Sequence, residues 1–268
     1  MIKFRKELRV NRPKVLITNF SSCGGCLLEI INLEDKLLDF AEVVHVADFR
    51  TAKSDFEPEP YDIAIVEGNV TMKEQIAKVS LVREHSKIVV AFGACACHGN
   101  VQFLSNYVGL EKGLEKGLEN AKKMVYGDAK MDYEIVDTKP IDRVIKVDHY
   151  LPGCPPNREE ILDFIKESVQ GKRFSEKTYP VCVECRLRGN FCIFKEDGIC
   201  LGPITRGGCG AICPTNGWPC SSCWGPVVQA NLDMEIQLMR DRKLSNEDIM
   251  AKFRKFTAGA KMYEELKL

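Results

Sequence analysis

Short apolar segments alternate with segments of helical periodicity over the first 170 residues. Apolar runs that end in Gly, Asn or other turn-forming residues predict buried parallel strands at 14–20, 42–49, 62–69, 87–94 and 143–151. Apolar positions at helical spacing predict helices at 27–40, 72–84 and 157–169. Asn157 is a suitable N-cap for the last helix, and Glu160 three residues later resembles a capping box. The alternation predicts an α/β fold with a flavodoxin-like, doubly wound parallel sheet.

The pattern changes near residue 171, where QGKRFSEKTYP (170–180) is typical of a linker. Residues 182–223 have little regular apolar periodicity and many Gly and Pro residues. Core packing alone is not expected to hold such a segment together, and inorganic cross-links are expected instead. We therefore predict two domains, a flavodoxin-like domain at 1–170 and an irregular, cysteine-rich domain at 171–268.

Charge and hydropathy exclude several classes of protein. The 268 residues carry 38 Lys and Arg against 38 Asp and Glu, which leaves no electrostatic footprint for a nucleic acid. No run of about 18 apolar residues is long enough to span a membrane. The first fourteen residues are basic but lack the apolar stretch of an export signal, so we expect a cytoplasmic protein. In that setting, the 13 cysteines are not expected to form a disulfide framework.

Four of the early cysteines follow predicted strands. Cys23 and Cys26 follow the first strand, Cys95 follows the fourth, and Cys154 follows the fifth. The carboxyl ends of parallel strands meet at one edge of a sheet, so these four thiols are expected to converge there. Four thiolates form a soft site for zinc or for an iron–sulfur cluster, and the C-x2-C pair alone also suits a redox-active dithiol.

The other eight cysteines form a dense second group, in the order Cys182-x2-Cys185-x6-Cys192-x7-Cys200-x8-Cys209-x3-Cys213-x6-Cys220-x2-Cys223. Eight cysteines make two sets of four. The spacing suits two ferredoxin-type 4Fe–4S clusters, and zinc ribbons are the alternative. Together with the first four, these sets use twelve cysteines and leave one over.

Several motifs together resemble the small subunit of a nickel–iron hydrogenase. They are SSCGGC (21–26), VEG (66–68), GACA (93–96), PGCPP (152–156) and the eight-cysteine segment. The resemblance extends from about residue 13 to residue 226. YPVCVECRLRGNFCIF (179–194) and CLGPITRGGCGAICP (200–214) are most similar to the delta subunits of cytoplasmic, NAD(P)-linked sulfhydrogenases.

This resemblance implies an electron-transfer subunit that holds three 4Fe–4S clusters and no nickel. The proximal cluster would be ligated by Cys23, Cys26, Cys95 and Cys154. The distal cluster would be ligated by Cys182, Cys185, Cys192 and Cys200, and the medial cluster by Cys209, Cys213, Cys220 and Cys223. The G-x-C motif of the family selects Cys95 and leaves Cys97 as the extra thiol. The implied partners are a nickel–iron large subunit, on which hydrogen is activated, and flavin- and NAD(P)-binding or ferredoxin-like electron-transfer subunits.

Some residues and alternatives remain open at this stage. Glu29, three residues after Cys26, is either a contact to a partner or a solvated carboxylate. Glu67, at the end of a predicted strand, is either a neighbour of the proximal cluster or a turn residue. The Leu27–Leu28 pair is expected at the interface with the large subunit. His98-Gly99-Asn100 departs from the family, where a smaller residue and a Gly-Gly pair are common. The alternatives are a subunit of a complex I-like or heterodisulfide-reductase-linked oxidoreductase, and a zinc-stapled interaction module.

Overall fold

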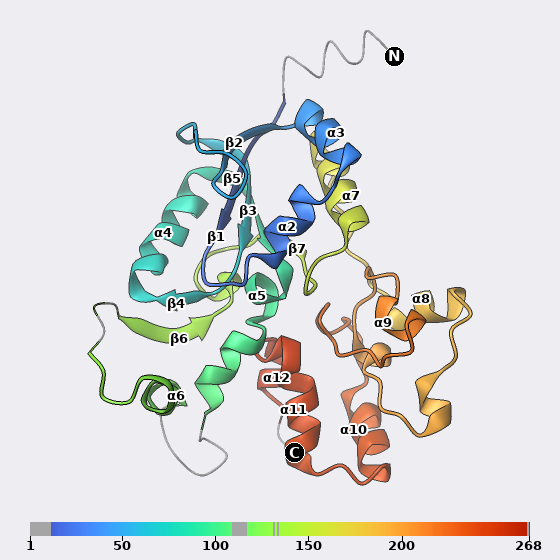
Figure 1. Ribbon diagram of the computed structural model, residues 1–268. Coiled ribbons are helices and arrows are strands. Elements are labelled where there is room, and N and C mark those ends of the chain that lie inside the picture. Colours follow the sequence, from blue (N-terminus) through green and yellow to red (C-terminus); the bar gives the residue numbers. More distant parts are fainter. Residues whose placement is uncertain (1–11, 109–116, 131, 133, 267) are drawn as a thin grey trace.

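The computed structural model describes residues 12–108, 117–130, 132, 134–266 and 268. A five-stranded, entirely parallel sheet in the order β2-β1-β3-β5-β7 forms its centre (Figure 1). Its strands are β1 (Lys14–Asn19), β2 (His45–Phe49), β3 (Tyr61–Glu67), β5 (Ser86–Phe92) and β7 (His149–Leu151). Numbered along the chain, this is the 2-1-3-4-5 order of flavodoxin-like folds, so the predicted fold class is confirmed. A separate antiparallel pair joins β4 (Val70–Met72) to β6 (Ile135–Lys139).

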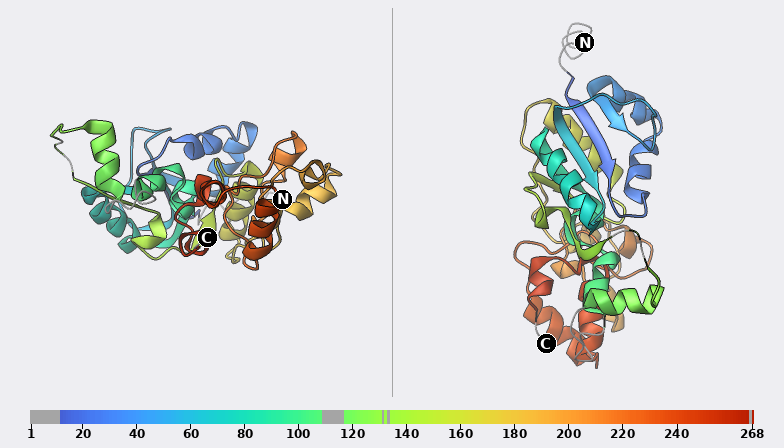
Figure 2. Two further views of the ribbon diagram at one scale, coloured as in Figure 1. Left: turned by 90° about the horizontal axis from the view of Figure 1, so that it is seen from below. Right: turned by 90° about the vertical axis from the view of Figure 1, so that its left-hand side faces the viewer.

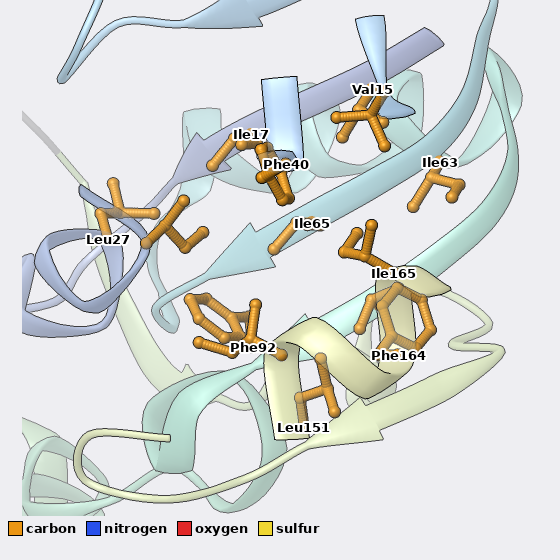
Figure 3. Packing of buried hydrophobic residues seen from close by; sticks show 14 of the residues in the cluster. Val15, Ile17, Leu27, Phe40, Ile63, Ile65, Phe92, Leu151, Phe164 and Ile165 are labelled. Carbon is orange, nitrogen blue, oxygen red and sulfur yellow. The ribbon is translucent and has the colours of Figure 1, made fainter. Parts of the chain in front are cut away.

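Helices cover both faces of the sheet because its strands are apolar on both sides. On one face lie α2 (Gly25–Ile31), α3 (Asp35–Val43) and α7 (Arg158–Val169), and on the other lie α4 (Lys73–Glu84) and α5 (Gly93–His98). Figure 3 shows the first of these two cores, in which Leu27, Phe40 and Phe164 pack against side chains of the strands. The short helices η1 (Val101–Tyr107) and α6 (Gly117–Tyr126) lie outside these layers.

Three predicted elements differ from the structure. The strand expected at 42–49 begins at His45, because Glu42 and Val43 still belong to α3. The single helix expected at 27–40 is interrupted, because α2 ends at Ile31 and Glu34, with φ 55°, starts α3. The apolar spacing did not reveal the break, since both helices face the same core. The strand expected at 143–151 is reduced to β7, and a 3₁₀ turn (Ile141–Arg143) precedes it. Asp148 directs its carboxylate to the N–H of Val89, which leaves only three residues for the strand ladder.

The cysteine-rich segment consists of short helices joined by irregular chain. They are α8 (Val181–Leu187), η4 (Ile193–Glu196), η5 (Gly202–Ile204) and α9 (Ile212–Thr215). After this segment, α10 (Leu232–Asp241), α11 (Asn246–Thr257) and α12 (Lys261–Glu264) pack around their own apolar core, which includes Met239, Phe253 and Tyr263. Figure 2 shows these helices beyond one end of the sheet. In the described part of the chain, no helix is both long and apolar enough to cross a membrane.

Candidate metal-cluster sites

The four early cysteines lie at the carboxyl edge of the parallel sheet. Cys23 precedes α2 and Cys26 lies in its first turn, directly after β1. Cys95 lies in α5 after β5, and Cys154 follows β7. Cys26 and Cys95 are buried, whereas Cys23 and Cys154 are exposed. The site therefore has an inner side against the sheet and an outer side open to a partner.

Hydrogen bonds place two of these thiols next to each other, because the amide of Asn100 reaches both Cys95 and Cys154. Burial, opposed by the hydrogen bond from Asn100 and assisted by negative charge on Cys154 and Cys23, raises the pKa of Cys95 to about 11. Burial also raises the pKa of Cys26, with additional contributions from Glu67, Cys95 and Cys154. Buried sulfurs that would repel one another as thiolates suit a shared cationic centre, which replaces their protons when it binds. The donor set thus fits a thiolate-ligated cluster.

Glu67 lies at the inner side of this site, at the end of β3. Its side chain is 1% exposed, and Oε1 accepts the backbone N–H of Cys26 over 3.2 Å. Burial raises the pKa of Glu67. Glu67 is therefore a neighbour of a proximal cysteine and not a solvated turn residue.

Gly93 allows the close approach of two loops. It has φ 85°, and a Cβ at this position would clash with the Sγ of Cys26. A side chain here would therefore push Cys26 away from the edge of the sheet. The glycine of the G-x-C motif thus has a packing role at the site.

The structure separates Cys95 from Cys97. Cys97 is 4% exposed and belongs to the apolar core beneath the sheet, and its thiol donates to the carbonyl oxygen of Ala91 over 3.3 Å. Cys95 instead accepts a hydrogen bond from Asn100, whose amide also reaches Cys154. Within this short helix, Cys95 therefore faces the site of the first four cysteines, whereas Cys97 faces the apolar core.

The first four cysteines of the second group also interact. Burial, together with negative charge on Cys200, Cys185 and Cys192, raises the pKa of Cys182 to about 12. A Cβ at Gly202 would lie 3.2 Å from the Sγ of Cys182 and 3.4 Å from that of Cys200. The amide of Asn190 donates to the Sγ of Cys185 over 3.7 Å. These contacts bring together the set predicted to hold the distal cluster.

The last four cysteines surround a cavity of about 480 Å³. Its wall includes Cys209, Cys213, Cys220 and Cys223, the four residues of the predicted medial set. Burial raises the pKa of Cys209 to about 11 and that of Cys223 to about 12. Negative charge on Cys209 and Cys213 contributes to the raised pKa of Cys223.

The three sets are in contact with one another. Cys154, in the first set, lines the same cavity as Cys223 of the last set. The backbone N–H of Cys220 donates to the Sγ of Cys200 over 3.2 Å. The set around the cavity therefore lies between the other two, and one cysteine of each outer set touches it.

Trp224 packs between the first and the last set of cysteines. Its Nε1 donates to Glu160 Oε2 over 3.1 Å, and a Cβ at Gly153 would lie 2.6 Å from its ring. The N-cap prediction for Asn157 is confirmed by its bond from the N–H of Glu159. The resemblance to a capping box was misleading, because the Glu160 carboxylate accepts from Trp224.

The surface of the first site differs from the expectation in one respect. Leu27 is 2% exposed and belongs to the core, whereas Leu28 is 50% exposed (Figure 3 shows Leu27 inside the core). Only Leu28 is thus available to a partner. Glu29 forms an ion pair with the Nε of Arg158 over 2.6 Å, a structural contact between α2 and α7.

Two neighbours of the cysteines were not predicted as functional. Asn100 and Asn190 contact the sites from outside the cysteine motifs. The only sequence signal was at Asn100, which stands where the resembling family often has glycine. Among the residues that the structure describes, no three Cys, His, Asp or Glu side chains are placed to hold a single metal ion.

Comparison with known proteins adds three findings. The family model of the NADH ubiquinone oxidoreductase 20 kDa subunit matches residues 23–168. Sulfhydrogenase 2 subunit delta of Pyrococcus furiosus is 34% identical over 244 residues, which cover 91% of this chain and 98% of the relative. The delta subunit of the NAD-reducing hydrogenase HoxS of Cupriavidus necator is 30% identical over 175 residues, covering 62% of this chain and 83% of the relative.

A solved structure has the same fold. It is that of an NAD+-reducing NiFe-hydrogenase in the H2-reduced state, with a TM-score of 0.51 and 24% identity. The match covers 61% of this chain and 94% of the matched chain.

Proposed function

We propose that this chain, which belongs to the family of the NADH ubiquinone oxidoreductase 20 kDa subunit and the sulfhydrogenase delta subunits and is a subunit of a hydrogenase, is the small subunit of that enzyme. Through it, electrons travel between a hydrogen-activating large subunit and an acceptor-linked partner. In this proposal it carries three 4Fe–4S clusters, one in the flavodoxin-like domain (1–170) and two in the cysteine-rich domain (171–268).

The observation that carries the proposal is the chain of contacts between the three cysteine sets. Cys154 and Cys223 line the same cavity, and Cys200 accepts from the backbone of Cys220. Such contacts favour a linear order of proximal, medial and distal clusters. When bound, iron–sulfur clusters supply one-electron redox chemistry.

The residues of this chain would ligate the clusters, exclude water and set the polarity around the sulfurs. The buried cysteines Cys26, Cys95, Cys200 and Cys220 provide inner ligands away from solvent. Gly93 and Gly202 leave room beside the sulfurs. Backbone and side-chain N–H groups direct positive charge toward the sulfurs, which is one way in which proteins adjust cluster potentials.

The two ends of the proposed relay suit different partners. At the proximal end, Cys23, Cys154 and Leu28 are exposed, and we propose that the nickel–iron large subunit covers them. At the distal end, Val183, Leu187 and Phe191 are exposed around α8, and we propose that a flavin- and NAD(P)-binding or ferredoxin-like subunit docks there. The proposal places the complex in the cytoplasm and includes no nucleic acid.

Anaerobic purification of the tagged chain from its native cells tests this function. We expect a nickel-containing large subunit to copurify in about equal amount, and hydrogen to reduce the iron–sulfur clusters, as detected by EPR. A Cys95→Ser variant should lose the reduction of the more distant clusters by hydrogen. A nickel-free complex whose clusters do not respond to hydrogen would overturn the proposal.

A further inference from the structure

Asn100 contacts two cysteines of the proximal set. Its Nδ2 lies 3.3 Å from the Sγ of Cys95 and 3.5 Å from that of Cys154. Asn100 is 5% exposed, so solvent does not compete effectively for these hydrogen bonds. One side-chain amide therefore directs its N–H groups to a sulfur of α5 and to a sulfur of the segment after β7.

The backbone fixes the orientation of this amide. Asn100 has φ 52°, in the left-handed region that Gly, Asn and Asp tolerate better than other residues. Its Oδ1 accepts the N–H of Val101 over 2.8 Å. Because the oxygen is engaged by the following residue, Nδ2 is directed toward the cysteines.

The amide stabilises negative charge on these two sulfurs, because each N–H directs a partial positive charge toward a sulfur. A cluster held by them gains one negative charge on reduction, so the same donors would favour its reduced state.

We propose that Asn100 tunes the proximal cluster, raising its reduction potential through hydrogen bonds to Cys95 and Cys154. The inference rests on the proposed function, since it requires a cluster at these cysteines. Asn100 is a positioning and tuning residue and does not itself ligate iron. Glycine at this position would accommodate the backbone but would supply no donor.

The structure offers a matched comparison at the other end of the relay. Asn190 donates from Nδ2 to the Sγ of Cys185 over 3.7 Å, and the same amide reaches Thr215 Oγ1 over 3.0 Å. This amide is thus shared with a hydroxyl and contacts a single cysteine of the distal set. A change at Asn190 should therefore leave the proximal cluster unaffected.

The test uses the assembled complex, purified anaerobically, and EPR-monitored redox titration of each cluster. The variants are Asn100→Gly, Asn100→Asp and the control Asn190→Ala. Glycine removes the amide and tolerates φ 52°, so Asn100→Gly should retain its full iron content. Asn100→Asp preserves the shape but replaces the donor with a negative charge.

We expect the proximal midpoint potential to become more negative in Asn100→Gly and more negative still in Asn100→Asp. The medial and distal potentials should stay at their wild-type values in both variants, and Asn190→Ala should leave the proximal potential unchanged. An unchanged proximal potential in Asn100→Gly, with iron content intact, would overturn the inference and leave the proposed function standing. A wild-type complex without a proximal iron signal would instead overturn the proposed function, and this inference with it.

Discussion

The indole Nε1 of Trp224 donates to Glu160 Oε2 over 3.1 Å, and both side chains are buried. This bond joins Trp224, which follows the last cysteine, to α7, which packs on one face of the parallel sheet. It therefore couples the cysteine-rich segment to the flavodoxin-like layers at the point where the first and last cysteine sets meet.

Removing this hydrogen-bond donor should destabilise the contact between the cysteine-rich segment and α7. Trp224→Phe leaves a buried carboxylate without its partner, which is expected to cost about 1–3 kcal/mol of stability. The matched control is Trp218→Phe, because Trp218 flanks the same C-x2-C pair but is 70% exposed. Thermal unfolding of the anaerobic complex should show a lower Tm for the Trp224 variant alone. Equal Tm values for both variants would contradict this role.

The two cysteines of α5 should behave differently when replaced. Cys95→Ser should remove the proximal cluster, with a loss of about four irons per chain. Cys97→Ser should retain all clusters and reduce stability only modestly, because Cys97 packs in the apolar core and donates to Ala91. Iron analysis and EPR of the two variants check this. Loss of a cluster in Cys97→Ser, with retention in Cys95→Ser, would show that the ligand has been misassigned.

His98 should make the stability of the complex depend on pH. Burial, followed by the charge of Arg206, lowers its pKa from 6.5 to about 4. The unfolded chain therefore binds this proton at a higher pH than the folded chain does. The contribution of His98 to the free energy of unfolding is fully present above pH 6.5. It is lost as the pH falls toward 4, by at most about 1.4 kcal/mol per pH unit.

His98→Gln should flatten this part of the profile. Tm values of the wild-type and variant complexes, measured between pH 7.5 and 5, provide the comparison. As the pH falls, the Tm of the wild-type complex should decrease more than the Tm of the variant complex. Parallel curves over this interval would be inconsistent with a His98 that is neutral in the folded chain.

The adjacent leucines after Cys26 allow a test of the large-subunit interface. Leu28→Glu places a charge on the exposed side chain and should weaken assembly by about tenfold or more, a free-energy cost of about 1.4 kcal/mol. The variant chain should still fold with its cluster ligands in place. Leu27→Glu should instead reduce the yield of folded chain, because Leu27 lies in the core. Quantitative copurification distinguishes the two, and undiminished assembly of Leu28→Glu would contradict the proposed interface.

The sequence was sufficient for those features that depend on periodicity and chain order. The alternation of strands and helices predicted the parallel sheet, and the rule that ligand sites lie at carboxyl strand ends predicted the edge that carries Cys95 and Cys154. Local breaks were less accessible. Glu34 interrupts a helix whose apolar stripe continues across the break, so periodicity carries no sign of it.

Contacts between distant segments were beyond the reach of sequence patterns. Leu27 and Leu28 are identical in type, and only the packing of α2 on the sheet decides which one is buried. Glu160 occupies a capping-box position, but its carboxylate accepts a hydrogen bond from Trp224, 64 residues further along the chain. Asn100 was noticeable only as a departure from the resembling family.

The number of clusters is the central claim of this account, and anaerobic metal analysis tests it most directly. Twelve cysteines in three sets predict about twelve irons and twelve acid-labile sulfides per chain, by four of each per cluster. Iron and zinc should be measured on the assembled complex by mass spectrometry, with the large subunit's own metals subtracted. About twelve irons with no zinc is the predicted result. About four irons with two zincs per chain would contradict the account and favour a zinc-stapled second domain.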